Sequence, residues 1–201
     1  MRYRVGIAGV SGLVMHNGAA GLDAGSAWNV ERAGIARKRA GSRTAADELR
    51  LRELECLVSL WLDDEQRPAV PAAAVRACVE SGARRVRQGP LVREGLRVED
   101  GVRFGYDTER YGESLEELGT SAQFTAAVVV QRARILRTRA KFDAPWSLEF
   151  TVGVNPELVG KQELAQWLEI AGDRVGLGDW RPEKSGSYGR FRTDSIDELP
   201  P

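Results

Sequence analysis

Several residue types that commonly build active sites are scarce in this sequence of 201 residues. His16 is the only histidine, which excludes a metal site made of several histidines and disfavours a Cys/His zinc site. A catalytic triad would also have to use His16, and Ser11 nearby has no orienting partner in the sequence. The two cysteines, Cys56 and Cys78, lie among apolar neighbours and are predicted to be buried free thiols in a reducing compartment.

Motifs that bind cofactors are absent as well. No G-x-x-x-x-G-K-[ST] phosphate-binding loop occurs. Gly176 and Gly178 follow a predicted helix and precede a predicted strand, which reverses the order of a dinucleotide-binding turn. No apolar run is long enough for a signal peptide or a membrane span. We therefore expect a cytoplasmic protein without a metal, a cofactor or a membrane partner.

Net charge is absent too, because 29 basic and 29 acidic residues cancel. Local charge is nevertheless strong. Residues 31–43 hold five basic residues and one acidic residue, a net charge of +4, and residues 121–141 hold five basic residues and no acidic one. Lysine occurs only at positions 38, 141, 161 and 184, so arginine supplies most of this charge. Arginine suits bidentate phosphate contacts, although a GC-rich genome would enrich it equally.

Hydrophobic periodicity and turn signals predict the elements of the first half of the chain. The expected order is a glycine-interrupted strand over 3–15, a small-residue loop over 16–43, a helix after Thr44, a second helix from Pro71 and a hairpin over 96–106. Thr44 and Asp47 have the spacing of a capping box. Asp100-Gly101 is typical of the type I′ turn in a two-residue hairpin.

The second half begins with an acidic stretch and continues with basic strands. The expected order is a solvated loop or an excursion from the main body over 107–117, a strand from Phe124 that continues to Lys141, a strand over 146–154, a helix from Lys161, a glycine-rich turn over 175–191 and a mobile tail after Thr193. At the two-residue period of a strand, one face carries Arg137, Arg139 and Lys141, and Arg132 and Arg134 share a face of their own. Such a face suits a row of phosphates, and the alternative is a solvated edge strand guarded by charge.

The glycine-rich turn over 175–191 is the stretch best suited to a ligand. Glycine lets the backbone take positive φ and lets a ligand approach closely. The strand expected to leave this turn carries Tyr188, Arg190 and Arg192. Trp180 fits two roles, an anchor of the turn on the core or a platform for a stacked base, and we favour the anchor.

Three stretches resemble the RAMP superfamily of CRISPR proteins, whose core is a modified RNA-recognition fold. The first strand breaks into a small-residue loop at Leu13-Val14-Met15-His16-Asn17-Gly18. Arg67-Pro68-Ala69-Val70-Pro71-Ala72-Ala73-Ala74-Val75-Arg76 is similar to the family's P-x-I-P-G-S-S-L-R-G, with three alanines in place of Gly-Ser-Ser. Val175-Gly176-Leu177-Gly178 and Gly186-Ser187-Tyr188-Gly189-Arg190-Phe191 resemble its C-terminal glycine-rich loop. Uncharacterised phage and prophage proteins have a similar start and end.

The resemblance implies an α+β fold with a ferredoxin-like or RRM-like β-α-β-β-α-β core. The chain would be a single domain over 1–201, with a β-rich, thumb-like insertion at about 89–120 and an acidic tail at about 194–201. It implies non-enzymatic binding of single-stranded RNA or DNA, RNA in particular, through phosphates and base stacking. The assembly would be a head-to-tail homo-oligomer or a multi-subunit nucleoprotein complex of CRISPR-like or phage type.

The residues assigned to the nucleic acid come from the basic stretches, the first loop and the glycine-rich turn. They are His16, Arg37, Lys38, Arg39, Arg43, Arg132, Arg134, Arg137, Arg139, Lys141, Arg181, Lys184, Tyr188 and Arg190. The aromatic side chains expected to stack on bases are Trp28, Tyr188 and Phe191.

Two alternatives stay open. In some members of the superfamily an Asp of the first loop cuts target RNA, and Asp23 lies in the comparable loop of this chain. An RNA-cleaving protein that uses Asp23 is therefore one alternative, although a lone Asp is more often a turn former. A phage structural or assembly protein on an RRM-like scaffold is the other.

Overall fold

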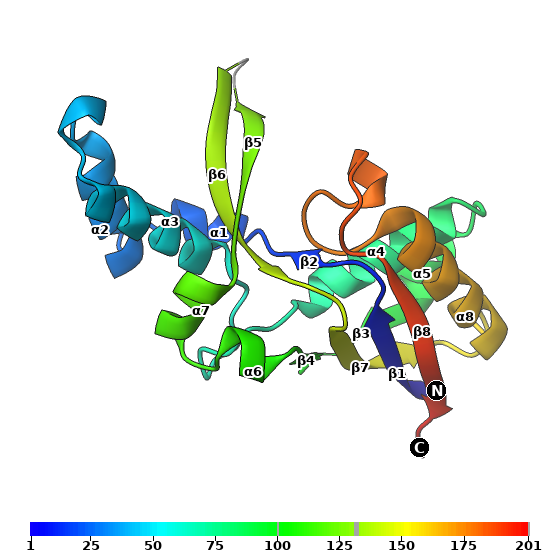
Figure 1. The fold of residues 1–201 in the computed structure, drawn as a ribbon. Helices are drawn as coiled ribbons and strands as arrows, with labels where there is room; N and C mark the ends of the chain where they lie inside the picture. Colours follow the sequence, from blue (N-terminus) through cyan, green and yellow to red (C-terminus); the bar gives the residue numbers. More distant parts are fainter. Residues whose placement is uncertain (100, 131–132, 201) are drawn as a thin grey trace. The chain divides into compact units, whose positions relative to one another are not determined.

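The computed structural model describes residues 1–99, 101–130 and 133–200. Within these residues the chain is an α+β protein with eight α-helices and two antiparallel sheets (Figure 1). It divides into two compact units, where the sequence predicts a single domain. Unit 1 comprises Met1–Leu13, Ala69–Tyr106 and Phe142–Pro201, and unit 2 comprises Val14–Pro68 and Asp107–Lys141. The predicted insertion at about 89–120 includes the point between Tyr106 and Asp107 at which the chain passes from unit 1 to unit 2.

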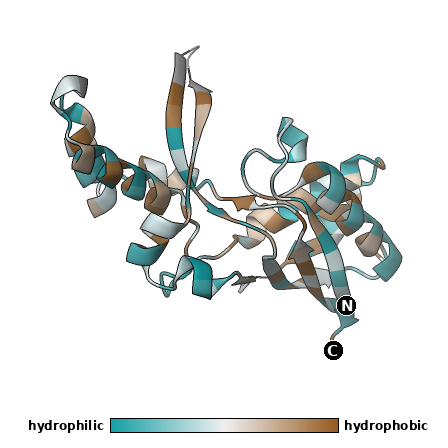
Figure 2. Cartoon of the chain, in the orientation of Figure 1, coloured by the Kyte–Doolittle hydropathy of each residue, from teal (hydrophilic) through white to brown (hydrophobic). Residues whose placement is uncertain are grey.

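Unit 1 is built on a five-stranded antiparallel sheet. Its strands are β1 (Arg2–Gly9), β3 (Leu96–Val98), β4 (Arg103–Gly105), β7 (Ser147–Val154) and β8 (Phe191–Glu198). The order across the sheet is β3-β7-β1-β8, and β4 also pairs with β7. Alternate residues of the central strands are buried, such as Val5 in β1 and Phe150 opposite it in β7. One face of the sheet therefore forms the core, and Figure 2 shows hydrophobic residues along β1 and β7.

Helices α4 (Ala72–Arg84) and α8 (Lys161–Ile170) pack against each other and against this sheet. Gly82 allows their close approach, since a Cβ at this position would lie 2.6 Å from the carbonyl oxygen of Trp167. Trp167 is fully buried, and its indole N–H donates to Gln88 Oε1 at 2.7 Å. The other helical elements of unit 1 are α5 (Gly89–Gly95), the π-helical turn η2 (Ala171–Val175) and the 3₁₀ turn η3 (Pro182–Lys184).

Unit 2 combines a three-stranded sheet with helices centred on α3. The strands are β2 (Leu13–Val14), β5 (Gln123–Val130) and β6 (Ala133–Phe142), in the order β2-β6-β5. The helical elements are α1 (Gly18–Leu22), α2 (Ala27–Arg37), η1 (Ala40–Ser42), α3 (Ala45–Ser59), α6 (Thr108–Tyr111) and α7 (Leu115–Ser121). Helix α3 contacts α1, α2, α7 and β5, and it buries Leu54, Cys56 and Leu57. It is therefore the core helix of this unit.

Several predicted elements are confirmed. The capping box of α3 is complete: Thr44 Oγ1 accepts the Asp47 N–H at 3.1 Å, and the Asp47 carboxylate accepts the Thr44 N–H at 3.0 Å. Helix α4 begins directly after Pro71. Both cysteines are buried free thiols, and burial raises the pKa of Cys56 to about 12 and that of Cys78 to about 12. Neither thiol is therefore a ready nucleophile.

The predicted hairpin over 96–106 is wrong. Strands β3 and β4 both pair with β7 rather than with each other, with Val98 opposite Val152 and Arg103 opposite Glu149. The two short strands thus follow one another along the same edge of β7. Asp100 of the predicted turn lies outside the described residues.

Two stretches predicted to be loops are helical. Residues 16–43 contain α1, α2 and η1, and residues 107–117 contain α6 and the start of α7. Side-chain caps begin three of these helices, namely Asn17 for α1, Asp107 for α6 and Ser114 for α7. Each cap satisfies a backbone N–H of the first helical turn, which lets a short helix start without a strong apolar stripe.

The predicted continuous strand from Phe124 to Lys141 is instead a hairpin. Strands β5 and β6 pair antiparallel, with Phe124 opposite Arg139. Alternation along β6 nevertheless places Arg137, Arg139 and Lys141 on one face, as predicted.

Two boundaries near the C-terminus also differ from the prediction. Strand β8 begins at Phe191, so Tyr188 and Arg190 precede it. The strand continues to Glu198 and pairs with β1, so residues 194–198 belong to the sheet rather than to an acidic tail.

The glycine-rich segment between η2 and β8 closes on its own main chain. Gly176, Gly178 and Gly189 have φ values of 77°, 75° and 73°. The Leu177 N–H donates to the Gly189 carbonyl at 2.9 Å, and the Gly189 N–H donates to the Gly12 carbonyl at 2.8 Å. A Cβ on Gly189 would lie 1.8 Å from the carbonyl oxygen of Leu177. No larger residue therefore fits at this position unless the main chain moves.

We expect Gly189→Ala to lower the free energy of unfolding by at least about 2 kcal/mol, because it adds a main-chain clash to a positive φ. Gly101→Ala is the matched control. Gly101 has a φ of 84°, but beyond its chain neighbours no atom lies within 4 Å of its Cβ position. Gly101→Ala should therefore lower the free energy of unfolding by only about 1 kcal/mol. Denaturant unfolding measures both values, and equal losses would contradict the clash at Gly189.

Candidate nucleic-acid interface

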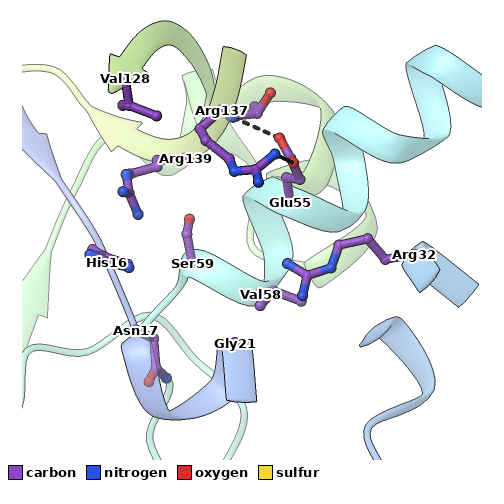
Figure 3. A pocket seen from close by; sticks show the side chains of 11 residues that line it. His16, Asn17, Gly21, Arg32, Glu55, Val58, Ser59, Val128, Arg137 and Arg139 are labelled. Carbon is purple, nitrogen blue, oxygen red and sulfur yellow. Dashed lines mark hydrogen bonds and ion pairs between the residues drawn. The ribbon is translucent and has the colours of Figure 1, made fainter. Parts of the chain in front are cut away.

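A pocket of about 400 Å³ in unit 2 brings together predicted site residues from separate segments (Figure 3). His16 follows β2, while Arg137 and Arg139 lie on β6. Arg32 from α2 and Glu55 from α3 complete the charged lining. The fold therefore gathers cations that are far apart in the sequence.

Two polar side chains of α3 fix the position of β6 at this pocket. A Glu55 carboxylate oxygen accepts the Thr138 N–H at 2.8 Å. Ser59 Oγ accepts the Ala140 N–H at 2.7 Å and donates to the Cys56 carbonyl at 2.7 Å. Glu55 and Ser59 are one helical turn apart, and Thr138 and Ala140 are two residues apart on one edge of β6. The helix thus supplies acceptors for two successive edge amides of the strand.

The segment that carries His16 is fixed on both sides. The Met15 N–H donates to the Ala140 carbonyl at 2.9 Å, and the Asn17 N–H donates to the Ser59 carbonyl at 3.0 Å. The Asn17 side chain also caps α1. His16 lies between these anchored residues and is exposed. Its ring is therefore presented at the pocket from a well-defined backbone.

The pocket carries a net positive charge. The described lining residues include three arginines, Arg32, Arg137 and Arg139, and a single carboxylate, that of Glu55. Arg137 Nη1 lies 3.2 Å from Glu55 Oε1, so the Glu55 carboxylate partly neutralises the charge of Arg137 within the pocket. Arg32 has no hydrogen bond or ion pair with any residue in the described part of the chain. Guanidinium groups bind phosphate oxygens in bidentate fashion, so this lining suits an anionic group.

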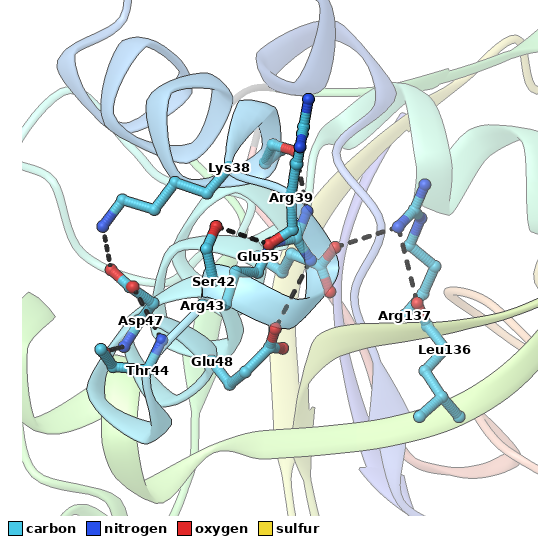
Figure 4. A network of polar contacts seen from close by, with 11 residues as sticks. Lys38, Arg39, Ser42, Arg43, Thr44, Asp47, Glu48, Glu55, Leu136 and Arg137 are labelled. Atoms are coloured by element: carbon cyan, nitrogen blue, oxygen red, sulfur yellow. Dashed lines mark hydrogen bonds and ion pairs between the residues drawn. The ribbon is translucent and has the colours of Figure 1, made fainter.

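Two of the four cations in the predicted basic cluster over 37–43 form ion pairs within the protein (Figure 4). Its internal ion pairs are Lys38–Asp47 at 2.6 Å and Arg43–Glu48 at 3.4 Å. Arg37 and Arg39 are exposed and have no ion pair with a residue that the structure describes. Of the four predicted residues, Arg37 and Arg39 are thus the ones available to a ligand.

Two predicted cations of the glycine-rich segment in unit 1 also form ion pairs within the protein. Arg181 Nη2 lies 2.9 Å from Glu183, and Arg190 Nη1 lies 2.9 Å from Asp173. These pairs stabilise the segment. Of the other two predicted residues of this segment, Lys184 is exposed and Tyr188 is half-buried.

The remaining cations of the hairpin differ in their surroundings. Lys141 lies over the ring of Phe124, with Nζ 5.1 Å from the centroid, in a cation–π contact. Lys141 is not among the described residues that line the pocket. Arg132 lies outside the described residues, as does the side chain of Arg134.

Asp23 serves as a turn former. It is the C-cap of α1, and its Oδ1 accepts the Gly25 N–H at 3.0 Å. It is not among the described residues that line the pocket. The structure therefore gives no support to a catalytic role for this carboxylate.

The aromatic residues expected to stack on bases are partly buried. Phe191 is only 6% exposed and packs against Gly172, where a Cβ would come within 3.0 Å of its ring. Phe191 is therefore a core residue, and its predicted stacking role is wrong. Trp28 and Tyr188 are half-buried.

Arg32 and Glu55 line the pocket but were not predicted as site residues. Helix α2 was hard to recognise because Asn29 and Ile35 are its only buried residues among those described. Glu55 lies among several charged residues of α3, and its carboxylate accepts a hydrogen bond from the Thr138 N–H of β6. The signal in the sequence that marks the start of α2 is Ser26, which lies at its N-cap position.

Comparison with known proteins gives no family: no protein-family model matches the chain, and no curated protein matches it significantly. Within residues 1–99, 101–130 and 133–200, no group of three or more His, Cys, Asp or Glu side chains could hold a metal ion. No helix among the described residues is long and apolar enough to cross a membrane.

We expect Glu55→Ala to lower the free energy of unfolding by about 1–3 kcal/mol, because the buried Thr138 N–H loses its acceptor. Glu48→Ala is the matched control on the same helix. It removes the ion pair between Arg43 and the half-exposed carboxylate of Glu48. The free energy of unfolding should therefore fall by less than about 1 kcal/mol. Thermal or denaturant unfolding compares the two variants. A Glu55→Ala chain as stable as Glu48→Ala would contradict the role of this hydrogen bond.

Proposed function

We propose that this chain binds single-stranded nucleic acid, RNA in particular, through backbone phosphates and without cleaving it. The observation that carries the proposal is the pocket of unit 2, whose lining includes Arg32, Arg137 and Arg139 and a single carboxylate, that of Glu55. Val58 and Val128 give the same pocket an apolar wall, against which a sugar or base can pack. At about 400 Å³ it has the size of a small-molecule site, so it suits one nucleotide of a single strand rather than a duplex.

Exposed cations of the same unit extend this binding surface. Arg37 and Arg39 on and after α2 have no internal ion pair in the described part of the chain. Cations that contact the phosphates of a bound nucleic acid outside the pocket add affinity. This part of the affinity depends on the salt concentration and not on the base sequence. No second function is proposed for Asp23, because its carboxylate accepts the Gly25 N–H in a turn.

We also propose that unit 1 is a ferredoxin-like, RRM-like core and that the chain is a RAMP-type protein that assembles head to tail. The strand order β3-β7-β1-β8 supports this, with α4 and α8 following the first and third core strands. The glycine-rich segment between α8 and β8 supports it as well, because it occupies the place of the family's C-terminal loop. Fold alone does not give function, so nucleic-acid binding rests on the pocket.

Replacement of pocket arginines tests the proposed function. We expect Arg32→Ala and Arg137→Ala each to weaken binding of a single-stranded RNA oligonucleotide by about three- to tenfold, because each removes a charge-assisted contact. Each should also reduce the log–log salt slope by about 0.7. Fluorescence anisotropy over a range of salt concentrations measures both effects.

The control for these variants is Arg52→Ala, which removes the same charge from an exposed position on α3. Its affinity and salt slope should stay close to those of the unaltered chain. If Arg32→Ala and Arg137→Ala match this control, the pocket is not the binding site. If the unaltered chain shows no salt slope, nucleic-acid binding itself is refuted.

Glu55→Gln should have the opposite effect on binding. The amide oxygen can still accept the Thr138 N–H, but the negative charge that competes for Arg137 is removed. We expect affinity for single-stranded RNA to rise about two- to fivefold, as for the loss of a partly exposed ion pair. Glu48→Gln, which removes a charge elsewhere on α3, should change it less. Weaker binding by Glu55→Gln would show that the carboxylate assists the ligand instead of competing with it.

A further inference from the structure

A second basic pocket, of about 580 Å³, lies in unit 1. Three arginines from three elements line it: Arg76 from α4, Arg93 from α5 and Arg97 from β3. Glu94 is the acidic residue among its described lining. None of these residues was predicted as a site residue, and none belongs to the pocket of unit 2.

Tight main-chain connections bring these arginines together. Helix α5 ends at Gly95 and passes directly into β3 at Leu96. The Gly95 carbonyl accepts the Asn155 N–H at 2.9 Å, and Leu96 lies opposite Val154 of β7. Gly95 is needed here because a Cβ would come within 2.9 Å of the Val159 side chain. The segment that carries Arg93 and Arg97 is therefore held in a fixed position.

A glycine lies opposite Arg97 in the lining of the pocket. Gly153 pairs with Arg97 in the register of β3 and β7. A Cβ added to Gly153 would meet a Glu99 oxygen at 3.9 Å and no other atom within 4 Å beyond its chain neighbours. Gly153 therefore adds no side chain beside Arg97, and the nearest group at this position is the Glu99 carboxylate.

The positive charges of this pocket are partly compensated. Arg76 and Arg97 have no hydrogen bond or ion pair with any residue in the described ranges, although Arg97 is close enough to Glu99 to lower the pKa of that carboxyl group. Arg93 Nε lies 3.9 Å from Glu80 Oε1, an oxygen that Arg84 already binds at 2.6 Å. Three guanidinium groups thus share one pocket with the carboxylate of Glu94, and they repel one another unless an anion lies between them.

We propose that this pocket of unit 1 binds a phosphate group. Three guanidinium groups from three elements offer more donors than the two oxygens of a planar carboxylate can accept, whereas a phosphate has three terminal oxygens. The pocket volume is within the range of small-molecule sites, so the phosphate belongs either to a free nucleoside phosphate or to a nucleic-acid backbone. The proposal does not depend on the pocket of unit 2.

Calorimetric titration of the full chain with inorganic pyrophosphate tests the proposal. We expect the unaltered chain to bind pyrophosphate and the Arg76→Ala/Arg97→Ala variant to bind it at least about tenfold more weakly. The matched control is Arg4→Ala/Arg85→Ala, which removes two exposed arginines of the same unit from outside the pocket and should bind like the unaltered chain. No binding by the unaltered chain, or equal binding by all three proteins, overturns the proposal.

The same three proteins titrated with single-stranded RNA distinguish the two sources of phosphate. If the pocket variant loses both ligands, the site holds a nucleic-acid phosphate; if it loses only pyrophosphate, the site serves a free nucleoside phosphate. Both outcomes support a phosphate site, whereas a pyrophosphate affinity that only Arg137→Ala lowers assigns the anion to unit 2 and overturns it. If the double variant does not fold, as judged by its thermal unfolding, Arg97→Gln on the exposed side of β3 replaces it, with the same criterion for pyrophosphate.

Discussion

The Thr138 and Ala140 amides, which β6 directs away from β5, need hydrogen-bond acceptors, and this need organises unit 2. A buried N–H without an acceptor costs about 1–3 kcal/mol, which few small units can tolerate. Glu55 and Ser59 meet the need from one face of α3, so the helix and the hairpin have a single relative register. The same contacts place Arg137 beside Glu55 at the pocket. Polar satisfaction, more than apolar packing, therefore shapes the candidate binding site.

Much of the fold was predictable wherever burial imposes a regular spacing. Strand β7 alternates buried and exposed residues along its whole length, and α3 has both an apolar stripe and a capping box. The prediction failed where a partner distant in sequence outweighed a local signal. Asp100-Gly101 predicts that β3 and β4 pair with each other. Instead, both strands pair with the same edge of β7. Helices α1 and α2 were missed because they bury few residues.

The site was less predictable than the fold, because a count of cations does not show which of them are paired. Lys38 and Arg190 belong to basic stretches, yet Asp47 and Asp173 neutralise them. Arg137 and Arg139 could be placed together because strand alternation fixes which side chains share a face. Arg32 could not, because its position depends on how α2 packs against α3, and no local spacing encodes that contact.

The glycine-rich segment of unit 1 obtains its shape from contacts between main-chain atoms, such as that of Leu177 with Gly189. The Arg181–Glu183 and Arg190–Asp173 ion pairs add to these main-chain contacts. Positions such as Lys184 and Ser187, which point to solvent, can change without deforming the frame that presents them. Substitutions at these two positions would therefore change the surface of the loop and leave its main-chain frame intact.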